Sequence, residues 1–206
     1  MQNSKLITGP ALIILLIASV KLFAQAEEFT SMPTGRGEYS LVSYVGGGAG
    51  MYAADAGTPV HLQTNIDKLK TNASFRVMWH PDHLLRFGLE TGYMTFYSYT
   101  LKDSAGRAGK AALRAVPILV EWSMALTKRF NIFAGSGIYL LSTDLDYITK
   151  TKSHKVSIGW MAAASYIQPV SKNMGLGMEL KFMDAAETSD GSLSFQLQWV
   201  WKFLNW

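Results

Sequence analysis

The chain of 206 residues contains no cysteine. That absence excludes disulfide bonds, cysteine-based zinc sites, a thiol nucleophile and an acylated lipoprotein cysteine. Charge is also scarce, at 17% of residues against about 25% in average soluble domains. The balance of 19 basic and 15 acidic residues is too even for a nucleic-acid-binding surface. Because 49% of the residues are hydrophobic, a disordered chain is excluded too, and the length allows one domain with or without a leader.

The first segment reads as an export signal. Residues 6–20 carry no charge, and these fifteen residues span only about 23 Å as a helix, too short for ~30 Å of hydrocarbon. Ala24 and Ala26 match the small-residue pattern of a cleavage site. The sequence therefore predicts a cleaved signal peptide over 1–26 and a periplasmic lead-in over 27–37. An uncleaved anchor is the alternative, and Lys21 counts toward it. An exported chain without cysteine fits a bacterial envelope.

After the leader, the dominant hydrophobic period is two. In the segment 192–203, aromatic or leucine side chains occupy every second position from Leu193 to Phe203, and mostly polar residues lie between them. Successive side chains of a strand point to opposite faces, so this pattern predicts a strand with one apolar face. No later stretch approaches the ~20 apolar residues of a membrane-spanning helix. Similar patterns, and composition alone for 131–142, predict eight strands, at 38–52, 70–79, 85–98, 111–127, 131–142, 155–168, 173–183 and 191–203. The two faces of the segment 131–142 cannot be assigned from its sequence.

The connections between these strands alternate in length. Short ones at 80–86, 128–131 and 168–173 alternate with long polar ones at 53–69, 99–110, 143–154 and 184–190. An even number of strands, with short turns at one end and long loops at the other, is typical of an outer-membrane barrel. The predicted barrel domain covers 38–206, with an antiparallel up-and-down order. Pro117 would lose a ladder hydrogen bond, so we expect a bulge or a strand end near it.

Period two fits two kinds of barrel. A soluble barrel turns its apolar face inward and could bind an apolar ligand, whereas an outer-membrane barrel turns that face toward lipid. The polar face here is mostly glycine, alanine and serine, as the narrow lumen of eight strands requires. Tryptophans near strand ends suit the membrane interface. We therefore predict a transmembrane barrel with a lipid-facing aromatic girdle formed by Trp79, Trp122, Trp160, Trp199, Trp201 and Phe203.

These features also carry a family resemblance. The leader, the strand 192–203 and the terminal Trp206 resemble the small bacterial outer-membrane β-barrel proteins. Segments 115–120 and 132–139 resemble their Bacteroidota-type members. The resemblance implies that Phe203 and Trp206 form an assembly signal read by the barrel-assembly machinery. It implies no catalytic residue. Separately from the resemblance, we expect outer-membrane lipid and lipopolysaccharide as surroundings, contacts of the long loops with ligands, surfaces or partner proteins, and neither a metal nor a cofactor.

The polar face places several charges inside the predicted barrel. Three carboxylates fall at similar heights above the short turns, and a buried carboxylate is costly without a partner. We therefore expect a lumen charge cluster that acts as a plug; a gated ion path and paired carboxylates for acid–base catalysis are the alternatives. The predicted members are Arg76, Arg86, Glu90, Glu121, Glu179 and Lys181, with Lys202 also directed inward.

The remaining motifs are weaker. His80 and His83 resemble a metal pair but lie on a predicted turn. A lipid-A-modifying enzyme would need a serine and a histidine near the outer leaflet, for which the chain offers His154 with Ser157, or His61. The basic group Lys150, Lys152, His154 and Lys155 could contact lipopolysaccharide or belong to a solvated loop. The sequence thus favours a non-enzymatic outer-membrane barrel with four long extracellular loops, over such an enzyme or a soluble ligand-binding barrel.

Overall fold

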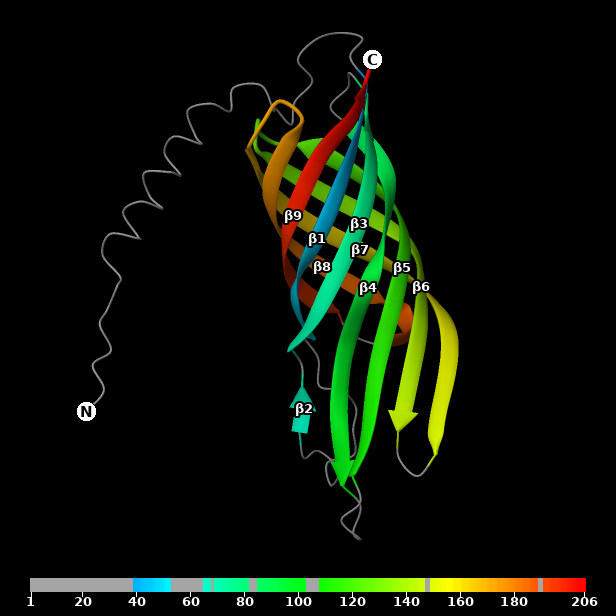
Figure 1. Cartoon of the computed structure of the whole chain (residues 1–206). Coiled ribbons are helices and arrows are strands. Elements are labelled where there is room, and N and C mark those ends of the chain that lie inside the picture. The colour runs from blue at the N-terminus through cyan, green and yellow to red at the C-terminus, as the bar shows by residue number, and fades with distance from the viewer. Residues whose placement is uncertain are drawn as a thin grey trace, which may run out of the picture.

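A computed structural model of the chain shows a closed ring of antiparallel strands (Figure 1). It describes residues 39–52, 65–67, 69–81, 85–102, 108–146, 149–188 and 191–206. The predicted signal peptide, with Ala24 and Ala26, and the lead-in lie outside these ranges. Within them, the ring consists of β1 (Ser40–Tyr52), β3 (Leu69–His80), β4 (Leu85–Lys102), β5 (Ala108–Ala125), β6 (Phe130–Asp146), β7 (Lys150–Pro169), β8 (Met174–Ala185) and β9 (Ser192–Asn205).

Two minor elements complete the described part. The short strand β2 (Asn65–Asp67) pairs with the far end of β4, and the 3-10 helix η2 (Ala186–Thr188) follows β8. Among the described residues, no helix is long and apolar enough to cross a membrane.

The ring closes between the first and last strands. Each strand from β3 onward pairs with its neighbour in sequence, β1 pairs with β3, and β1 also pairs with β9. Backbone hydrogen bonds of 2.9 and 3.0 Å between Tyr39 and Trp206 extend the closing ladder beyond the strand ends. A closed ring leaves no open strand edge around the body of the barrel. The predicted all-β, eight-stranded antiparallel up-and-down barrel is therefore confirmed.

Two of the four predicted long loops are wrong. The segments 99–110 and 143–154 continue as hairpins, with the last pairs at Lys102↔Ala108 and Asp146↔Lys150. Figure 1 shows both hairpins projecting beyond the body of the barrel. Where the β6–β7 hairpin leaves the barrel, both its faces meet water, so the hydrophobic alternation that marked the strands disappears. The backbone ladder continues without that alternation, which is why the sequence pattern ended too early.

The two faces of the barrel follow the predicted alternation. On β9, Leu193, Leu197 and Trp201 are exposed, while Ser194 and Gln198 are buried. The alternative of a soluble barrel, which would shield the tryptophans of β9 inside, is therefore wrong. For the segment 131–142, whose faces the sequence left unassigned, the structure turns the odd-numbered positions inward. The two faces cannot be told apart in the sequence, because the inward face mixes aromatic residues with glycines and the outward face contains small residues.

Pro117 lies inside β5 and does not end it. Its ladder with β6 is continuous, through the pair Pro117↔Tyr139. The ladder with β4 lacks pairs between Thr91↔Ile118 and Met94↔Ala115, and its register shifts between Thr95 and Tyr97. A proline cannot donate the hydrogen bond that the neighbouring strand would accept. The expected bulge thus occurs on the partner strand, a few residues beyond the proline.

Candidate functional site

Five buried charges meet in the lumen. Arg76 of β3 contacts three carboxylates: its Nη1 lies 2.7 Å from Glu179 Oε2, its Nε lies 2.5 Å from Glu121 Oε2, and its Nη2 contacts Glu90. Lys181 Nζ lies 2.6 Å from Glu90 Oε1 and 2.9 Å from Glu179 Oε1. These residues come from β3, β4, β5 and β8, and each is at most 2% exposed. We call this group the lumen network.

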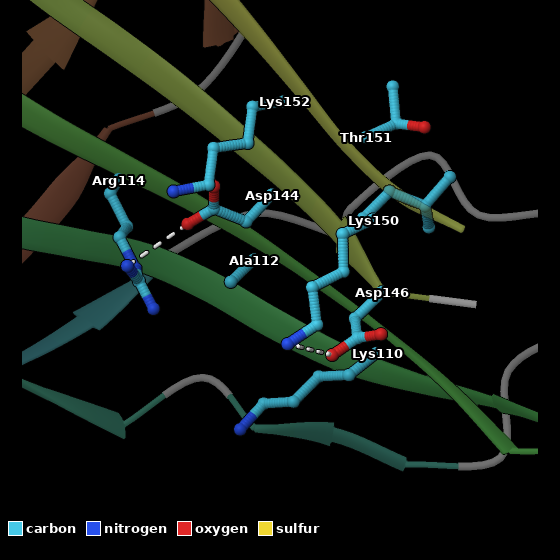
Figure 2. Close-up of a pocket in the computed structure, with 9 residues that line it drawn as sticks. Lys110, Ala112, Arg114, Asp144, Asp146, Lys150, Thr151 and Lys152 are labelled. Atoms are coloured by element: carbon cyan, nitrogen blue, oxygen red, sulfur yellow. Dashed lines mark ion pairs between the residues drawn. The ribbon is translucent and has the colours of Figure 1, made fainter. Parts of the chain in front are cut away.

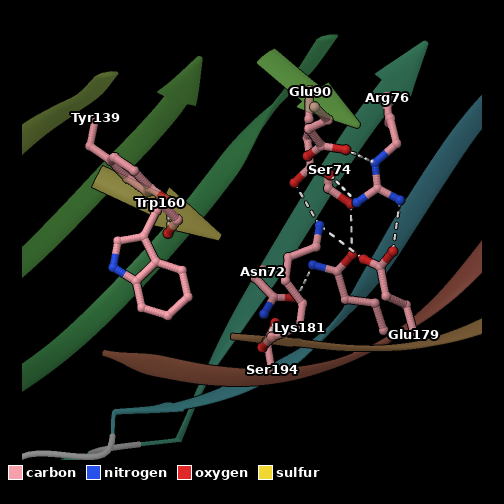
Figure 3. Close-up of polar contacts among 11 residues, drawn as sticks. Asn72, Ser74, Arg76, Glu90, Tyr139, Trp160, Glu179, Lys181 and Ser194 are labelled. Atoms are coloured by element: carbon pink, nitrogen blue, oxygen red, sulfur yellow. Dashed lines mark hydrogen bonds and ion pairs between the residues drawn. The ribbon is translucent and has the colours of Figure 1, made fainter. Parts of the chain in front are cut away.

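A layer of uncharged polar side chains borders the lumen network (Figure 3). The Ser74 hydroxyl donates to Gln196 Oε1 at 2.6 Å, and Gln196 Nε2 donates to Asn72 Oδ1 at 3.0 Å. Gly46 leaves room for this layer, because a Cβ there would lie 2.7 Å from Gln196 Oε1 and 2.9 Å from the Ser74 hydroxyl. Close packing inside the barrel thus requires a glycine at position 46 of β1.

Arg86, predicted as a member of the charge cluster, does not join the lumen network. Its Nη1 donates to Asn131 Oδ1 at 3.2 Å, and in the part of the chain that the structure describes no carboxylate lies within ion-pair distance of it. Arg86 lies four residues before Glu90 on β4, which is two inward positions nearer the short-turn end. The separation in height explains the difference. Lys202, also predicted to point inward, is half-buried near the end of β9.

The lumen network has the features of a structural plug. All three carboxylates contact cations, so their charge is compensated where desolvation would otherwise be costly. Buried side chains lie in the lumen on both sides of the network, among them Val42 and Met78 toward the short turns and Tyr52 and Phe96 toward the projecting hairpins. A carboxylate enclosed in this way offers a substrate no entry. The geometry therefore does not support the acid–base catalytic alternative.

A band of exposed apolar side chains surrounds the outside of the barrel. On β5, the outward positions from Val116 to Met124 cover about 27 Å of strand, or roughly 21 Å of height at a tilt of about 40°. That height is close to the ~25 Å apolar band of outer-membrane barrels. The positions are exposed to water in the isolated chain, with Val120 at 46% and Trp122 at 44%. A surface this apolar and this continuous is unsuited to water.

The predicted girdle residues lie on this outer surface at two levels. Trp160, Trp199 and Trp201 are each 47% exposed and Phe203 is 37% exposed. Trp79 is half-buried and packs against Phe87, with ring centroids 4.8 Å apart. Most of these rings lie toward the short turns. Trp160 lies toward the other end, where its Nε1 donates to Asp184 Oδ2 at 3.1 Å.

The apolar band ends abruptly on three neighbouring strands. The cross-strand row Val116↔Leu140↔Val156 is apolar, and the next outward row is Arg114↔Ser142↔His154. Beyond it follow the rows with Asp144 and Lys152, then Asp146 and Lys150. Because the change occurs in the same row on β5, β6 and β7, it marks one level on the barrel wall.

Above that level the outward side chains form a charged hollow, which we call the rim face (Figure 2). It is a pocket of about 250 Å³. Arg114 Nη1 lies 3.0 Å from Asp144 Oδ2, and Lys152 Nζ lies 4.0 Å from Asp144 Oδ1. Lys150 Nζ lies 3.7 Å from Asp146 Oδ2. The charged members of the rim face are Lys110, Arg114, Asp144, Asp146, Lys150 and Lys152.

The rim face differs from the basic group that the sequence suggested. Lys150 and Lys152 belong to it, but Lys155 has the opposite parity on β7 and contacts Glu187 Oε2 at 2.5 Å. Lys110 and Arg114, which sequence reasoning missed, join from β5. The signal that could have found them was weak, because their segment had been assigned partly to a loop. Only the ladder brings β5 and β7 onto opposite sides of β6.

Of the enzymatic and metal motifs, only the pair His154 and Ser157 lies fully within the described residues, and this pair does not come together. His154 and Ser157 are an odd number of positions apart on β7 and therefore point to opposite faces; His154 is exposed and Ser157 is buried. His61 and His83 lie outside the described residues. His80 Nε2 lies 3.5 Å from the Tyr44 hydroxyl. Among the described residues, no group of three or more histidine or acidic side chains is arranged to hold a metal ion.

Comparison with known proteins adds a distant likeness. No family model and no curated protein matches the chain. The solved structure of Ail, the attachment invasion locus protein of Yersinia pestis, is 10% identical, with a TM-score of 0.46 over 82% of this chain and 99% of that one. Neisserial surface protein A is 13% identical, with a TM-score of 0.43 over 81% and 97%. A structure of Ail is also known in complex with the heparin analogue sucrose octasulfate. The eight-stranded ring is established by the strand pairings within this chain.

Proposed function

We propose that this protein is an integral outer-membrane β-barrel without enzymatic activity, which anchors a surface-exposed ribbon of strands. The observation that carries the proposal is the exposed apolar band, which ends at one cross-strand level on β5, β6 and β7. Burying such a band in lipid removes apolar surface from water. The lumen network supports the proposal because it closes the interior, so an open pore is not expected.

The ribbon formed by the upper parts of β5, β6 and β7 is the proposed contact surface. β7 pairs with β8 only from the pair Gly159↔Ala185 onward. Its segment from Lys150 to Ile158 therefore pairs with β6 on one side, and no described strand pairs with its other edge. Such an edge presents backbone donors and acceptors to a partner strand. A protein partner outside the cell could bind there.

The finer parts of the proposal concern export and assembly. We propose that residues 1–26 are removed as a signal peptide, that the chain is of the Bacteroidota type, and that Phe203 and Trp206 are read by the barrel-assembly machinery. Trp206 is 60% exposed beside the backbone pairing with Tyr39, so its ring is accessible for recognition. Lipopolysaccharide would surround the outer half of the band.

Fractionation tests the membrane assignment. Cells expressing the protein are separated into periplasm and membranes, and the outer membrane is washed with alkaline carbonate. The protein should stay in the outer membrane, and unheated and boiled samples should migrate differently on a gel, because a closed barrel resists detergent until it is heated. Release into the wash together with identical mobility would overturn the proposal. A periplasmic marker protein serves as the control for leakage.

A further inference from the structure

The rim face lies directly above the apolar band on the same side of the same sheet. Val116, Leu140 and Val156 form the last apolar row, and Arg114 begins the charged rows. Each outward row adds about 7 Å along the strand, or roughly 5 Å of height at the usual tilt. The cations therefore lie within about 5 to 15 Å above the end of the apolar band. The headgroup layer of a bilayer is about 5–8 Å deep on each side, so the row of Arg114 lies within it, the row of Lys152 lies near its outer edge, and Lys110 lies beyond it.

The charges of the rim face do not cancel. Four cations accompany two carboxylates, and the carboxylates hold cations in place at 3.0 to 4.0 Å. Lys110 is exposed, and no described carboxylate lies within ion-pair distance of its amine. Arg114 keeps 46% of its side chain exposed. A guanidinium and ammonium groups converging on one hollow are suited to phosphate, which the Arg fork binds bidentately and lysine binds as a point charge.

We propose that the rim face binds the phosphate groups of a glycolipid of the outer leaflet. This inference rests on the proposed membrane function, and it names the ligand chemistry of one face. The lipid source follows from continuity: acyl chains that cover Val116, Leu140 and Val156 place their headgroup at the rows of Arg114 and Lys152. The two aspartates keep the cations oriented and leave a net positive hollow at the height of the phosphates.

The test measures binding of lipid A to the refolded barrel in detergent micelles. The probes are diphosphorylated lipid A and the same lipid with its phosphates removed, followed by tryptophan fluorescence. Arg114→Gln with Lys152→Gln should weaken binding of the diphosphorylated lipid about 25-fold, because each surface cation contributes about fivefold, equivalent to roughly 1 kcal/mol. The matched control combines Lys155→Gln, at the residue that contacts Glu187, with Lys172→Gln, in the turn between β7 and β8. It removes the same charge away from the rim face and should leave the affinity within about twofold.

The outcomes separate the rim face from the barrel. Equal affinity for lipid A with and without phosphate, or an equal loss in the control pair, would overturn the phosphate assignment. Competition by inorganic pyrophosphate at the same concentration as the lipid would place the ligand in solution and overturn the lipid assignment. All variants are first checked for the mobility shift on heating. A barrel that passes fractionation but fails here disproves the rim face alone, whereas failed fractionation disproves the membrane function.

Discussion

Removing charges from the lumen network one at a time should produce unequal losses of stability. Arg76 contacts three carboxylates and Glu179 contacts two cations, whereas Glu121 forms an ion pair with a single described cation, Arg76. Neither oxygen of Glu121 accepts a hydrogen bond from the described residues. The network also holds three carboxylates against two cations. Loss of one carboxylate therefore balances the charges, whereas loss of Arg76 leaves three carboxylates with one cation.

The magnitudes follow from these contacts. Arg76→Gln should lower the free energy of unfolding by about 3–5 kcal/mol, the usual cost of breaking a buried ion pair from one side. Glu179→Gln weakens two charged contacts of about 1.5 kcal/mol or more each, partly offset by the improved charge balance, so a loss of about 2–3 kcal/mol is expected. Glu121→Gln should cost about 1 kcal/mol or less, because the single contact it loses is offset by relief of carboxylate repulsion.

The assay is reversible urea unfolding of the barrel in lipid vesicles, followed by tryptophan fluorescence, with the heat-dependent gel shift as a check of closure. The expected order of destabilisation is Arg76→Gln, then Glu179→Gln, then Glu121→Gln. The explanation by charge balance would be refuted if Glu121→Gln were as destabilising as Arg76→Gln. A double variant of Arg76 and Glu121 gives the coupling between them, and additivity within about 0.5 kcal/mol would show that their contact has no energetic role.

Three further predictions use the same assays. Leu197→Arg places a charge in the centre of the apolar band and should cost about 2–4 kcal/mol in vesicles, whereas Leu145→Arg on the projecting ribbon should change stability by less than about 0.5 kcal/mol; equal effects would argue against a lipid-facing band. Gly46→Val should cost about 1–3 kcal/mol by overpacking, since its Cβ would meet lumen side chains at 2.7 and 2.9 Å, while Gly47→Ala, whose nearest atom is 4.0 Å away, should be nearly neutral in urea unfolding. Deleting Trp206 should reduce the heat-shifting fraction in cells but leave refolding of the purified chain unchanged, and a defect in both would assign Trp206 to stability.

Much of the barrel could be predicted because strand faces are a local property. The alternation on β9, from Leu193 to Phe203, identifies its apolar face without reference to any other strand. The same local rule failed where the two faces of a strand no longer differ in polarity. The upper parts of β6 and β7 meet water on both faces, and the inward face of β6 combines Asn131 with Phe133 and Gly135. In both cases the strands stay paired although their sequence shows no alternation of apolar and polar residues.

The sequence by itself determined the period, the approximate ends of most strands and the inward direction of the charges. Which charges meet was decided only by the tertiary structure. The register between strands and the shear of the ring set the height of each side chain, and these depend on pairings between distant segments. Glu90, Glu121 and Glu179 therefore converge on Arg76 while Arg86 lies below them. The same register brings Lys110 of β5 and Lys150 of β7 to opposite sides of Asp146.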